Sequence, residues 1–580
     1  MKIETIRHSL AHILAYAVQE LYPGTKFGIG PSIENGFYYD MDTDQHKSEN
    51  RSTQITLEDL PKIEAKMKEL IRKKIVFKKE LISKKEAEKL FKDQPYKLEL
   101  VKELKEEKVG IYKSGIFTDL CRGPHVKTAK EINPDAFKLT KIAGAYWKGD
   151  EKNPQLSRIY GVAFKNKKEL ENYLLKIEEA EKRDHRILGQ KLELFMFDEE
   201  VGAGLPLWMP KGAILRHIIE NYLYQELISQ GYQWIVTPHI GNISLWKTSG
   251  HWEHYRENMY SPIEIDKEQY LIKPMNCPFH VKIYNSKIRS YKDLPIRYAE
   301  MGTVYRYEKS GVLHGLIRVR GFTQDDAHVF LAPEQLGIEL KQLLKQGLKI
   351  LKTFGFKNFN LYLSTQPQKY AGTLKGWEKA TNSLKYVLKS LKLNYQIDPG
   401  GGVFYGPKID IKIKDSLGRE WQCSTFQIDF NLPERFKMFY TAKSGRKSQP
   451  IMIHRALLGS LERFIGVLLE HYAGALPLWL SPEQVWIIPV GTRHEKYADS
   501  INKQLTTHNL RTELKDENET VSKKVRSGEI QKIPYMLVVG DKEMKTKQVR
   551  VRERTRGDIG IMKLDKFLEK VKMEIDSKKS

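Results

Sequence analysis

The chain has 580 residues, and its 97 Lys and Arg against 73 Asp and Glu give a formal net charge of +24. The length favours three or four domains, and the positive excess favours a polyanion such as RNA, DNA or an anionic membrane, or else reflects a lysine-rich surface set by genome composition. Three cysteines argue against a disulfide framework, and we find neither an apolar run of 18 residues nor a signal peptide. We therefore expect a cytoplasmic protein with no membrane contact.

A helix is predicted over residues 6–21, because the apolar residues recur with the helical period. His8 and His12 lie four apart, on one side of that helix and roughly opposite its apolar stripe. Cys121 and His125 follow much later, in the segment TDLCRGPH. HxxxH with a distant CxxxH has the residue types and spacings of a zinc site, and a metal-free hydrolytic pocket is equally consistent with them.

Residues 166–186 are charged, with the pattern of a linker helix, and a Pro/Gly-rich boundary covers 203–213. A long helix is predicted over 213–229 and a strand over 232–238. His251 follows in a Gly/Ser/His segment that reads as a loop.

The segment from 301 to 330 concentrates charge on both sides of a loop bounded by glycines. Arg306 and Arg318 suit phosphate oxygens, because a guanidinium donates two hydrogen bonds at once. Glu308 lies two residues after Arg306 and is expected on the same strand face, where it can accept from an amine. A solvated hairpin with salt bridges is equally consistent with this spacing.

The last third of the chain alternates between strand and helix patterns. IMIHRALLGSLERF reads as a strand entering a helix, with Gly459 and Arg463 one turn apart. A separate α/β unit is expected from residue 481, ending in a helix over 564–575. Its four alternating arginines at 550, 552, 554 and 556 are predicted to share one strand face, suited to phosphates or bases or simply exposed to solvent.

Three segments, KPMNCP, RYE followed by GF, and IMIHRALLGSLERF, resemble those of the threonyl-tRNA synthetases, a class II family, and the resemblance runs over nearly the whole chain. It implies a multidomain α+β and α/β protein: an α+β editing domain (1–163), a linker helix (164–186), a class II catalytic core with an antiparallel sheet (187–480) and an α/β anticodon-binding domain (481–580). Many members carry a ubiquitin-like domain before the editing domain, which we expect this chain to lack. Phe279 stands where a glycine is expected.

The resemblance further implies ATP-dependent ligation of L-threonine to tRNA(Thr) through a threonyl-adenylate, with hydrolytic editing of seryl-tRNA(Thr). Mg²⁺ is expected with ATP, and the segment 213–238 is expected to form a homodimer interface. One Zn²⁺ per subunit is implied, with Cys277, His328 and His454 as ligands, although their spacing alone gives no metal signal. His251 is expected near the tRNA 3′ end, where it assists transfer.

The resemblance assigns the remaining site residues by motif position. ATP binding is expected from Arg306, Glu308, Arg318, Phe322, Gln422 and Arg463. Arg306 and Arg463 are also expected to act catalytically. Threonine binding is expected from Gln324, Asp326, Tyr405 and Gln427. Editing is expected from His8, His12, Lys97, Asp119, Cys121 and His125, without metal, and with bound zinc as the alternative. Anticodon reading is expected from Asn518, Glu543 and Arg552.

A zinc ion that selects a hydroxyl rejects valine, but serine differs from threonine by one methyl only, which is worth about 1–3 kcal/mol. A zinc-selected threonine enzyme therefore requires a second site that destroys the seryl product. Two other functions remain: a deacylase with a decayed synthetase core, and a non-catalytic RNA-binding protein.

Overall fold

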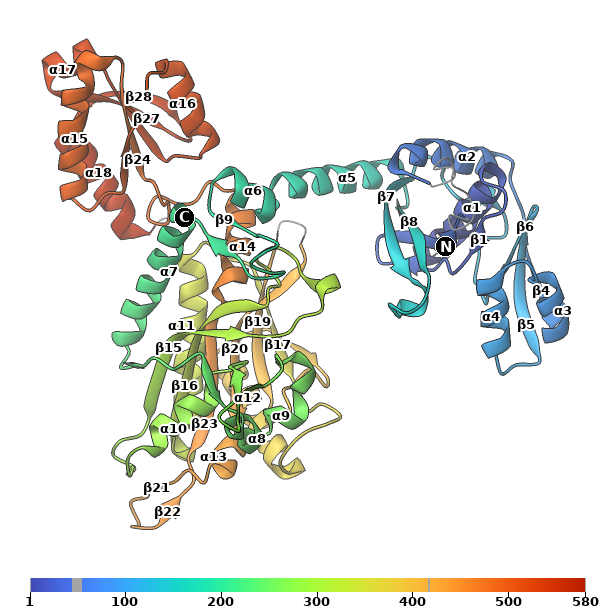
Figure 1. Ribbon diagram of the computed structural model, residues 1–580, viewed down its shortest axis with the longest axis horizontal. Helices are drawn as coiled ribbons and strands as arrows, with labels where there is room; N and C mark the ends of the chain where they lie inside the picture. Colours follow the sequence, from blue (N-terminus) through green and yellow to red (C-terminus); the bar gives the residue numbers. More distant parts are fainter. Residues whose placement is uncertain (1, 44–54, 416–417, 579–580) are drawn as a thin grey trace. The chain divides into compact units, whose positions relative to one another are not determined.

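The computed structural model of the protein describes residues 2–43, 55–415 and 418–578, coloured along the chain in Figure 1. The chain forms two compact units, Met1–Glu178 and Glu179–Ser580. Helix α5 (Lys167–Lys182) contains the boundary between them. Among the helices of the described residues, none is long and apolar enough to cross a membrane.

Helix α1 (Ile3–Leu21) is the central element of unit 1, because almost every side chain from Arg7 to Val18 is buried. It packs against α2 (Leu60–Arg72) and against strand β3 (Gly36–Asp42) of a sheet with the order β1-β3-β8-β7, in which β2 pairs with β3. The other strands of that sheet are β1 (Lys26–Phe27), β2 (Ser32–Ile33), β7 (Phe137–Tyr146) and β8 (Gln155–Ala163).

A second sheet of unit 1 covers the side of α1 that carries the histidines. Its strands are β4 (Phe77–Ser83), β5 (Lys108–Ser114) and β6 (Phe117–Leu120). Two helices accompany it, α3 (Lys84–Leu90) and α4 (Pro95–Glu103). Strands β5 and β6 contact α1, so the helix is enclosed on two sides. The predicted helix is confirmed, and this second sheet covers its two histidines.

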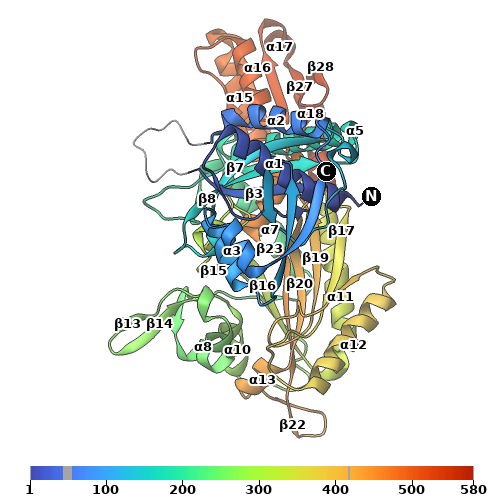
Figure 2. The same ribbon diagram turned by 90° about the vertical axis from the view of Figure 1, so that its right-hand side faces the viewer.

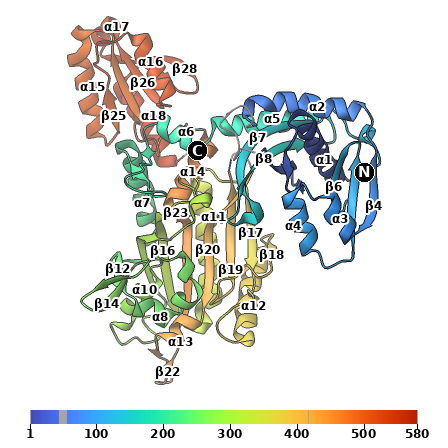
Figure 3. The same ribbon diagram turned by 45° about the vertical axis from the view of Figure 1, so that its right-hand side comes forward.

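An eight-stranded sheet with the order β11-β15-β16-β23-β20-β19-β17-β18 organises unit 2 (Figure 3). Its central strands are antiparallel: β15 (Ile296–Tyr305), β16 (Gly321–Leu331), β23 (Ile451–Ser460), β20 (Glu420–Asp429), β19 (Lys408–Lys414) and β17 (Phe359–Ser364). Its edge strands are β11 (Gln233–Trp234) and β18 (Gln396–Asp398). In this register His328 lies opposite His454, which lies opposite Gln427 on its other side.

Helices α11 (Leu336–Thr353) and α12 (Leu374–Ser390) lie against the sheet of unit 2 (Figure 2). They bury leucines and isoleucines in the same core as α7 (Pro210–Ile228) and α14 (Leu461–Tyr472). Ser460 caps α14 by accepting the Arg463 N–H at 3.2 Å. This fixes the start of the helix, whose first turn carries Arg463. The predicted helix over 213–229 is confirmed, but the strand after it is only two residues long.

Smaller elements surround the eight-stranded sheet of unit 2. Four short helices are α6 (His185–Lys191), α8 (Ser244–Ser249), α9 (His251–His254) and α13 (Asn431–Arg435), and α10 spans Cys277–Asn285. A three-stranded sheet contains β12 (Ile240–Asn242), β14 (Glu268–Ile272) and β13 (Ile263–Ile265). Two pairs are β9 (Phe195–Met196) with β10 (Leu207–Trp208) and β21 (Tyr440–Thr441) with β22 (Lys447–Ser448).

The C-terminal part forms a sheet with the order β25-β24-β26-β27-β28. The strands are β24 (Val485–Pro489), β25 (Thr512–Leu514), β26 (Tyr535–Val539), β27 (Gln548–Glu553) and β28 (Gly557–Lys563). The helices are α15 (Glu495–Thr507), α16 (Val521–Ile530), α17 (Asp541–Thr546) and α18 (Leu564–Ser577). Because β27 ends at Glu553, Arg554 and Arg556 do not share its face, and the predicted four-arginine strand is wrong.

Candidate functional site

Cys277, His328 and His454 come from three separate elements of unit 2 and meet at one point. Cys277 is the first residue of α10, His328 lies on β16 and His454 lies opposite it on β23. The three are buried, and one ligand atom from each lies within 4.8 Å of the others. Thiolate and imidazole are the ligands that zinc prefers, and three of them leave a fourth position open.

Hydrogen bonds on the outside of this cluster set the tautomer of both histidines. The Nε2 of His280 lies 3.0 Å from Glu300, and its Nδ1 lies 2.9 Å from the Nδ1 of His328. Glu300 accepts the His280 proton, so His280 accepts that of His328 and leaves the His328 Nε2 lone pair free. Asp429 accepts the Nε2 proton of His454 in the same way, at 2.8 Å. The two inner nitrogens, 2.9 Å apart, therefore carry lone pairs.

These residues fit a bound divalent metal, because each histidine has an acceptor on its outer nitrogen, as metal-ligating histidines have. Burial raises the pKa of the Cys277 thiol well above its ordinary value. A cation at the two inner nitrogens reverses this effect and favours the thiolate.

A cleft of about 1000 Å³ opens beside the metal cluster. It gathers the metal cluster with most of the predicted threonine and ATP residues: Arg306, Gln324, Asp326, Tyr405, Gln422 and Gln427. The Tyr405 hydroxyl donates to the Gln427 amide oxygen at 2.5 Å, and its ring lies 4.7 Å from that of His454. This end of the cleft combines a carboxylate, two amides and a hydroxyl, which suits a small amino acid.

Asn276 is buried behind this end of the cleft, and the sequence did not single it out. Its amide donates to the Asp326 carboxylate at 2.9 Å. Gly302 leaves the room, since a Cβ there would lie 2.3 Å from the Asn276 amide nitrogen. The available signal was its place in KPMNCP, directly before Cys277.

Arg306 lies where β15 has ended, so the predicted shared strand face with Glu308 is wrong. Its guanidinium packs 5.1 Å from the centre of the Phe322 ring, and its Nε donates to the Pro274 carbonyl. Glu308 pairs with Arg318 at 3.0 Å, so the two groups expected at opposite ends of a nucleotide contact each other in this structure.

Arg463 leaves the first turn of α14 and donates from its Nε to the Ile317 carbonyl at 2.9 Å. Its guanidinium lies 5.9 Å from the centre of the Trp421 ring. Arg318, Glu308, Phe322 and Arg463 do not line the cleft that holds the metal cluster. The structure thus groups the predicted ATP residues into one set at the cleft and another around the loop before β16.

Asp325 holds the end of β23 in place, a role that the charge pattern of the 301–330 segment did not predict. Its carboxylate accepts the N–H groups of Leu457, Leu458 and Gly459 at 2.7–3.1 Å. Burial raises the pKa of Asp325 to about 6. Gly459 takes a φ of +75°, which glycine adopts without strain, and the chain then turns into α14.

His251 is fully buried at the start of α9, so the predicted loop is wrong. Its Nδ1 lies 2.7 Å from the Ser249 hydroxyl and its Nε2 lies 3.9 Å from the Cys277 sulfur. Burial lowers the pKa of His251 to about 3, so its imidazole is neutral at pH 7. Phe279 points elsewhere, packing on Trp246 with ring centres 5.8 Å apart.

The six predicted editing residues meet inside unit 1. His8, His12, Cys121 and His125 offer ligand atoms within 4.8 Å of one another. The Cys121 sulfur lies 3.2 Å from His125 and 3.4 Å from His8. Burial raises the pKa of the Cys121 thiol to about 11 and lowers the pKa of the three histidines.

Asp119 joins the editing cluster to Lys97. It lies 3.2 Å from the His12 Nε2, accepts the Tyr39 hydroxyl at 2.6 Å and pairs with Lys97. The His12 Nδ1 is buried without a hydrogen-bond partner among the described residues. The His12 Nδ1 can therefore bond a further group, whether a water, an ester oxygen or a metal ion.

The three predicted anticodon residues are held separately. Asn518 is exposed between β25 and α16, Glu543 accepts the Gly540 N–H at 3.1 Å, and Arg552 lies 3.6 Å from Glu529. Among the described residues, no hydrogen bond or ion pair joins them.

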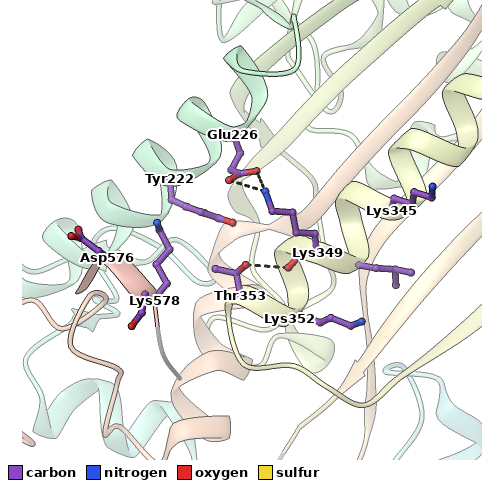
Figure 4. A pocket seen from close by; sticks show the side chains of 10 residues that line it. Tyr222, Glu226, Lys345, Lys349, Lys352, Thr353, Asp576 and Lys578 are labelled. Atoms are coloured by element: carbon purple, nitrogen blue, oxygen red, sulfur yellow. Dashed lines mark hydrogen bonds and ion pairs between the residues drawn. The ribbon is translucent and has the colours of Figure 1, made fainter. Parts of the chain in front are cut away.

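A separate hollow is lined by residues of α7, α11 and the end of α18 (Figure 4). It contains an ion pair between Glu226 and Lys349 at 2.9 Å, and it shares no residue with the cleft.

Three parts of the chain match known families. Residues 260–472 match the tRNA synthetase class II core domain (G, H, P, S and T), and 484–574 match an anticodon binding domain. Residues 109–160 match the threonyl and alanyl tRNA synthetase second additional domain.

Whole relatives and solved structures agree with these matches. Curated threonine--tRNA ligases from Sulfurihydrogenibium sp. (strain YO3AOP1) and Aquifex aeolicus (strain VF5) are 53% and 52% identical over 99% of this chain, covering 89% and 90% of their own lengths. A crystal structure titled as the RNA binding domain of threonyl-tRNA synthetase from Cryptosporidium parvum Iowa II is 40% identical, with a TM-score of 0.65 over 67% of this chain and 98% of its own. The chain belongs to the threonine--tRNA ligase family and is a class II aminoacyl-tRNA synthetase with an editing domain.

Proposed function

We propose that this chain joins L-threonine to tRNA(Thr) in two steps and removes serine attached in error. The observation that carries the proposal is the meeting of Cys277, His328 and His454 at the amino-acid end of the cleft. In the first step a threonine carboxylate oxygen attacks the α-phosphorus of ATP and pyrophosphate leaves. In the second, a hydroxyl of the terminal adenosine attacks the carbonyl carbon and AMP leaves.

Zinc is the metal that fits this donor set, and when bound it supplies a cation with an open position for the amino nitrogen and β-hydroxyl of threonine. The neighbouring side chains then orient the amino acid. The Asn276 amide donates to the Asp326 carboxylate at 2.9 Å and fixes its position. The carboxylate can then accept a hydrogen bond from the amino group of threonine. Gln427 is held by Tyr405 and lies opposite His454 in the sheet.

The ATP residues act by position and charge. Arg306 lies at the cleft and has no carboxylate partner among the described residues. Its guanidinium is therefore available to the α-phosphate. Binding of ATP with its Mg²⁺ requires Arg318 and Glu308 to exchange their mutual ion pair for the γ-phosphate and the adenine amine. That pair is exposed, so breaking it costs at most about 1 kcal/mol. Arg463 serves the γ-phosphate side, with Phe322 and Gln422 at the base.

Editing belongs to the cluster of His8, His12, Cys121 and His125 in unit 1, which we assign as metal-free. In this reaction water adds to the ester carbon of seryl-tRNA, and the ribose oxygen leaves with a proton. Asp119 contacts His12 and pairs with Lys97, and these contacts fix the position of the His12 ring. His12→Ala should let seryl-tRNA accumulate while threonylation persists, measured by deacylation of purified seryl-tRNA(Thr). Unchanged serine clearance would move editing to another part of the chain.

The remaining parts follow the division into an editing domain at 1–163, a linker helix at 164–186, a catalytic core at 187–480 and an anticodon-binding domain at 481–580. Asn518, Glu543 and Arg552 are assigned to anticodon reading, and His251 to transfer at the tRNA 3′ end. The α7 region is assigned to a homodimer interface because it exposes apolar side chains, Ile214, Tyr224 and Ile228 among them. A cytoplasmic location fits a translation enzyme with three free cysteines.

Metal analysis beside a threonine-dependent ATP–pyrophosphate exchange assay tests the proposal. The full chain should hold one zinc ion and exchange pyrophosphate. Cys277→Ser should lose both the zinc and the exchange, because a hydroxyl is a poor substitute for a thiolate ligand. The matched control is Cys121→Ser, which should keep both and clear seryl-tRNA more slowly.

Each other outcome points elsewhere. Two zinc ions per chain, with one lost in Cys121→Ser, would overturn the metal-free assignment of the editing cluster. Absence of exchange in the zinc-loaded chain would leave a deacylase or an RNA-binding protein as the function. Normal threonine activation by Cys277→Ser would refute the metal assignment.

A further inference from the structure

His185 is a fully buried histidine that takes no part in the chemistry proposed above. It is the first residue of α6, where the chain enters unit 2 after α5. Its side chain has no solvent exposure. It lies against two segments that carry proposed ATP-binding groups, α14 and the loop before β16.

The hydrogen bonds of His185 determine its tautomer. The Leu316 N–H donates to the His185 Nε2 at 3.1 Å, so this nitrogen carries a lone pair. The proton of the neutral ring is therefore on Nδ1, which donates to Glu470 on α14 at 2.9 Å. Asp184, His185 and Glu470 have the residue types of a metal site. With one nitrogen protonated and the other engaged by a backbone amide, however, this imidazole has no lone pair for a metal.

Two glycines make room for the ring. Gly315 takes a φ of +48°, and a Cβ there would lie 2.2 Å from the His185 Nε2. A Cβ on Gly466 of α14 would lie 3.4 Å from the ring carbon Cδ2. The imidazole is thus seated between the loop and α14, and no bulkier side chain is accommodated at Gly315 without moving the ring.

The residues after Leu316 connect this contact to the nucleotide groups. The Ile317 carbonyl accepts the Nε of Arg463, and Arg318 pairs with Glu308. Leu316 and Ile317 are buried. His185 and Arg463 therefore hold two consecutive residues of the same segment, Leu316 by its N–H and Ile317 by its C=O.

We propose that His185 is a positioning residue for ATP: by accepting the Leu316 N–H, it fixes the end of the loop that presents Arg318 and supports Arg463. The proposal rests on the ATP roles assigned above to those two arginines. It gives α6 a function in nucleotide binding, although α6 has no residue in the cleft. Without this acceptor, a buried N–H is left unpaired in the loop, which favours other loop conformations.

Three substitutions test the acceptor nitrogen of His185, Nε2, separately from the rest of its side chain. The amide of glutamine reaches the position of the imidazole Nε2, whereas the amide of asparagine reaches that of Nδ1. His185→Gln should therefore keep the Leu316 contact, and His185→Asn should keep only the Glu470 contact. His185→Phe retains ring volume and removes both. The measurements are KM for ATP and for threonine in pyrophosphate exchange, and hydrogen exchange of the Leu316 amide in the full chain.

The KM for ATP should rise roughly tenfold in His185→Asn and His185→Phe. It should change by less than threefold in His185→Gln, and the KM for threonine should stay within twofold throughout. The Leu316 amide should lose protection in the first two variants and keep it in the third. His494→Asn is the matched control, because His494 is equally buried and bonded to a carboxylate at 3.1 Å, but lies in the C-terminal part.

Two results would overturn the proposal. One is equal loss of activity and melting temperature in all three variants, because a purely structural histidine gives that pattern. The other is a protected Leu316 amide and an unchanged KM for ATP in His185→Phe. If the unmodified chain shows no exchange, the proposed function fails instead, and amide protection still reports on the His185 contact.

Discussion

Single protons decide whether the two histidines of the Cys277–His328–His454 group direct lone pairs toward each other. Glu300 accepts from His280, and His280 accepts from His328, so one carboxylate fixes the tautomer of a ligand that it does not touch. Glu300 is itself held by the Thr237 hydroxyl and N–H at 2.8 and 3.0 Å. Because every member is buried, a wrong tautomer has no solvent partner to compensate it.

Glu300→Gln should weaken zinc binding by about 10- to 100-fold, as loss of an outer partner of a metal ligand typically does. The reason is that an amide can donate to His280 and reverse both tautomers, which places a proton on the inner nitrogen of His328. Retention of zinc against a competing chelator measures the effect. Glu339→Gln is the control, because Glu339 is also buried but pairs with Arg297. Equal zinc retention in the two variants would contradict this tautomer chain.

At this scale the proposed metal ligands could be predicted only through the family resemblance. Cys277, His328 and His454 lie too far apart in the chain to form a spacing motif, and it is the strand register that brings the two histidines together. His280, Glu300 and Asp429 are ordinary residue types whose value depends on their partners, so no pattern marks them. Asn276 was within reach, because it stands beside a proposed ligand in a quoted motif.

At the scale of the element, the apolar period of α1 predicted the helix but not all of its surroundings. Its 3.6-residue period predicted the helix, but period alone cannot show that a second sheet covers the opposite side. Enclosure explains why burial lowers the pKa of His8, His12 and His125 from an ordinary value of 6.5. The side of α1 that carries the histidines, opposite its apolar stripe, is thus covered as well.

Acid should loosen α1 before it loosens α7. The unfolded chain binds protons on these histidines near pH 6.5, whereas the folded chain binds them only at lower pH. Their contribution to stability is therefore complete above pH 6.5 and is lost as the pH falls below it. Hydrogen exchange between pH 7.5 and 5.5, corrected for intrinsic rates, should show falling protection in α1 and little change in α7. Parallel loss in both helices would argue against this origin.

Strand ends were the least predictable elements. The segment after α7 read as a seven-residue strand, yet only Gln233 and Trp234 pair with β15. The arginine alternation from 550 to 556 continues past the end of β27, where Arg554 donates to main-chain carbonyls instead. In both cases the side-chain pattern continues beyond the residues that pair with a neighbouring strand.

At the scale of the whole molecule, the order of the motifs along the chain predicts the order of the domains. The exposed fractions of the side chains show which surfaces are apolar. Tyr224 and Ile228 on α7 are 38% and 40% exposed, and Val236 just after β11 is 84% exposed. Exposed apolar side chains such as these are expected at a homodimer interface. The helical period of α7 alone did not identify it, because an amphipathic helix can pack equally well within one chain.

Val236→Asp should shift the protein from dimer toward monomer, because it places two buried charges across a twofold interface. Sedimentation velocity at micromolar concentration measures the shift. Ile288→Asp is a closely matched control, since Ile288 is also 84% exposed. A protein that stays dimeric with Val236→Asp, or a native chain that sediments as a monomer, would remove α7 from the interface.

The pairing of β16 with β23 contains one irregularity, because Gln324 lies opposite Ser460 whereas Asp326 lies opposite Ala456, so β23 has extra residues there. Because neighbouring residues on a strand point to opposite faces, one added or lost residue in β23 would turn His454 toward the helices and Arg455 toward the substrate. Such a change disables the metal, amino-acid and nucleotide groups together. Laboratory evolution of this cleft should therefore accept exchanges of side chains and lengthening of loops, but no change in the number of residues in these strands.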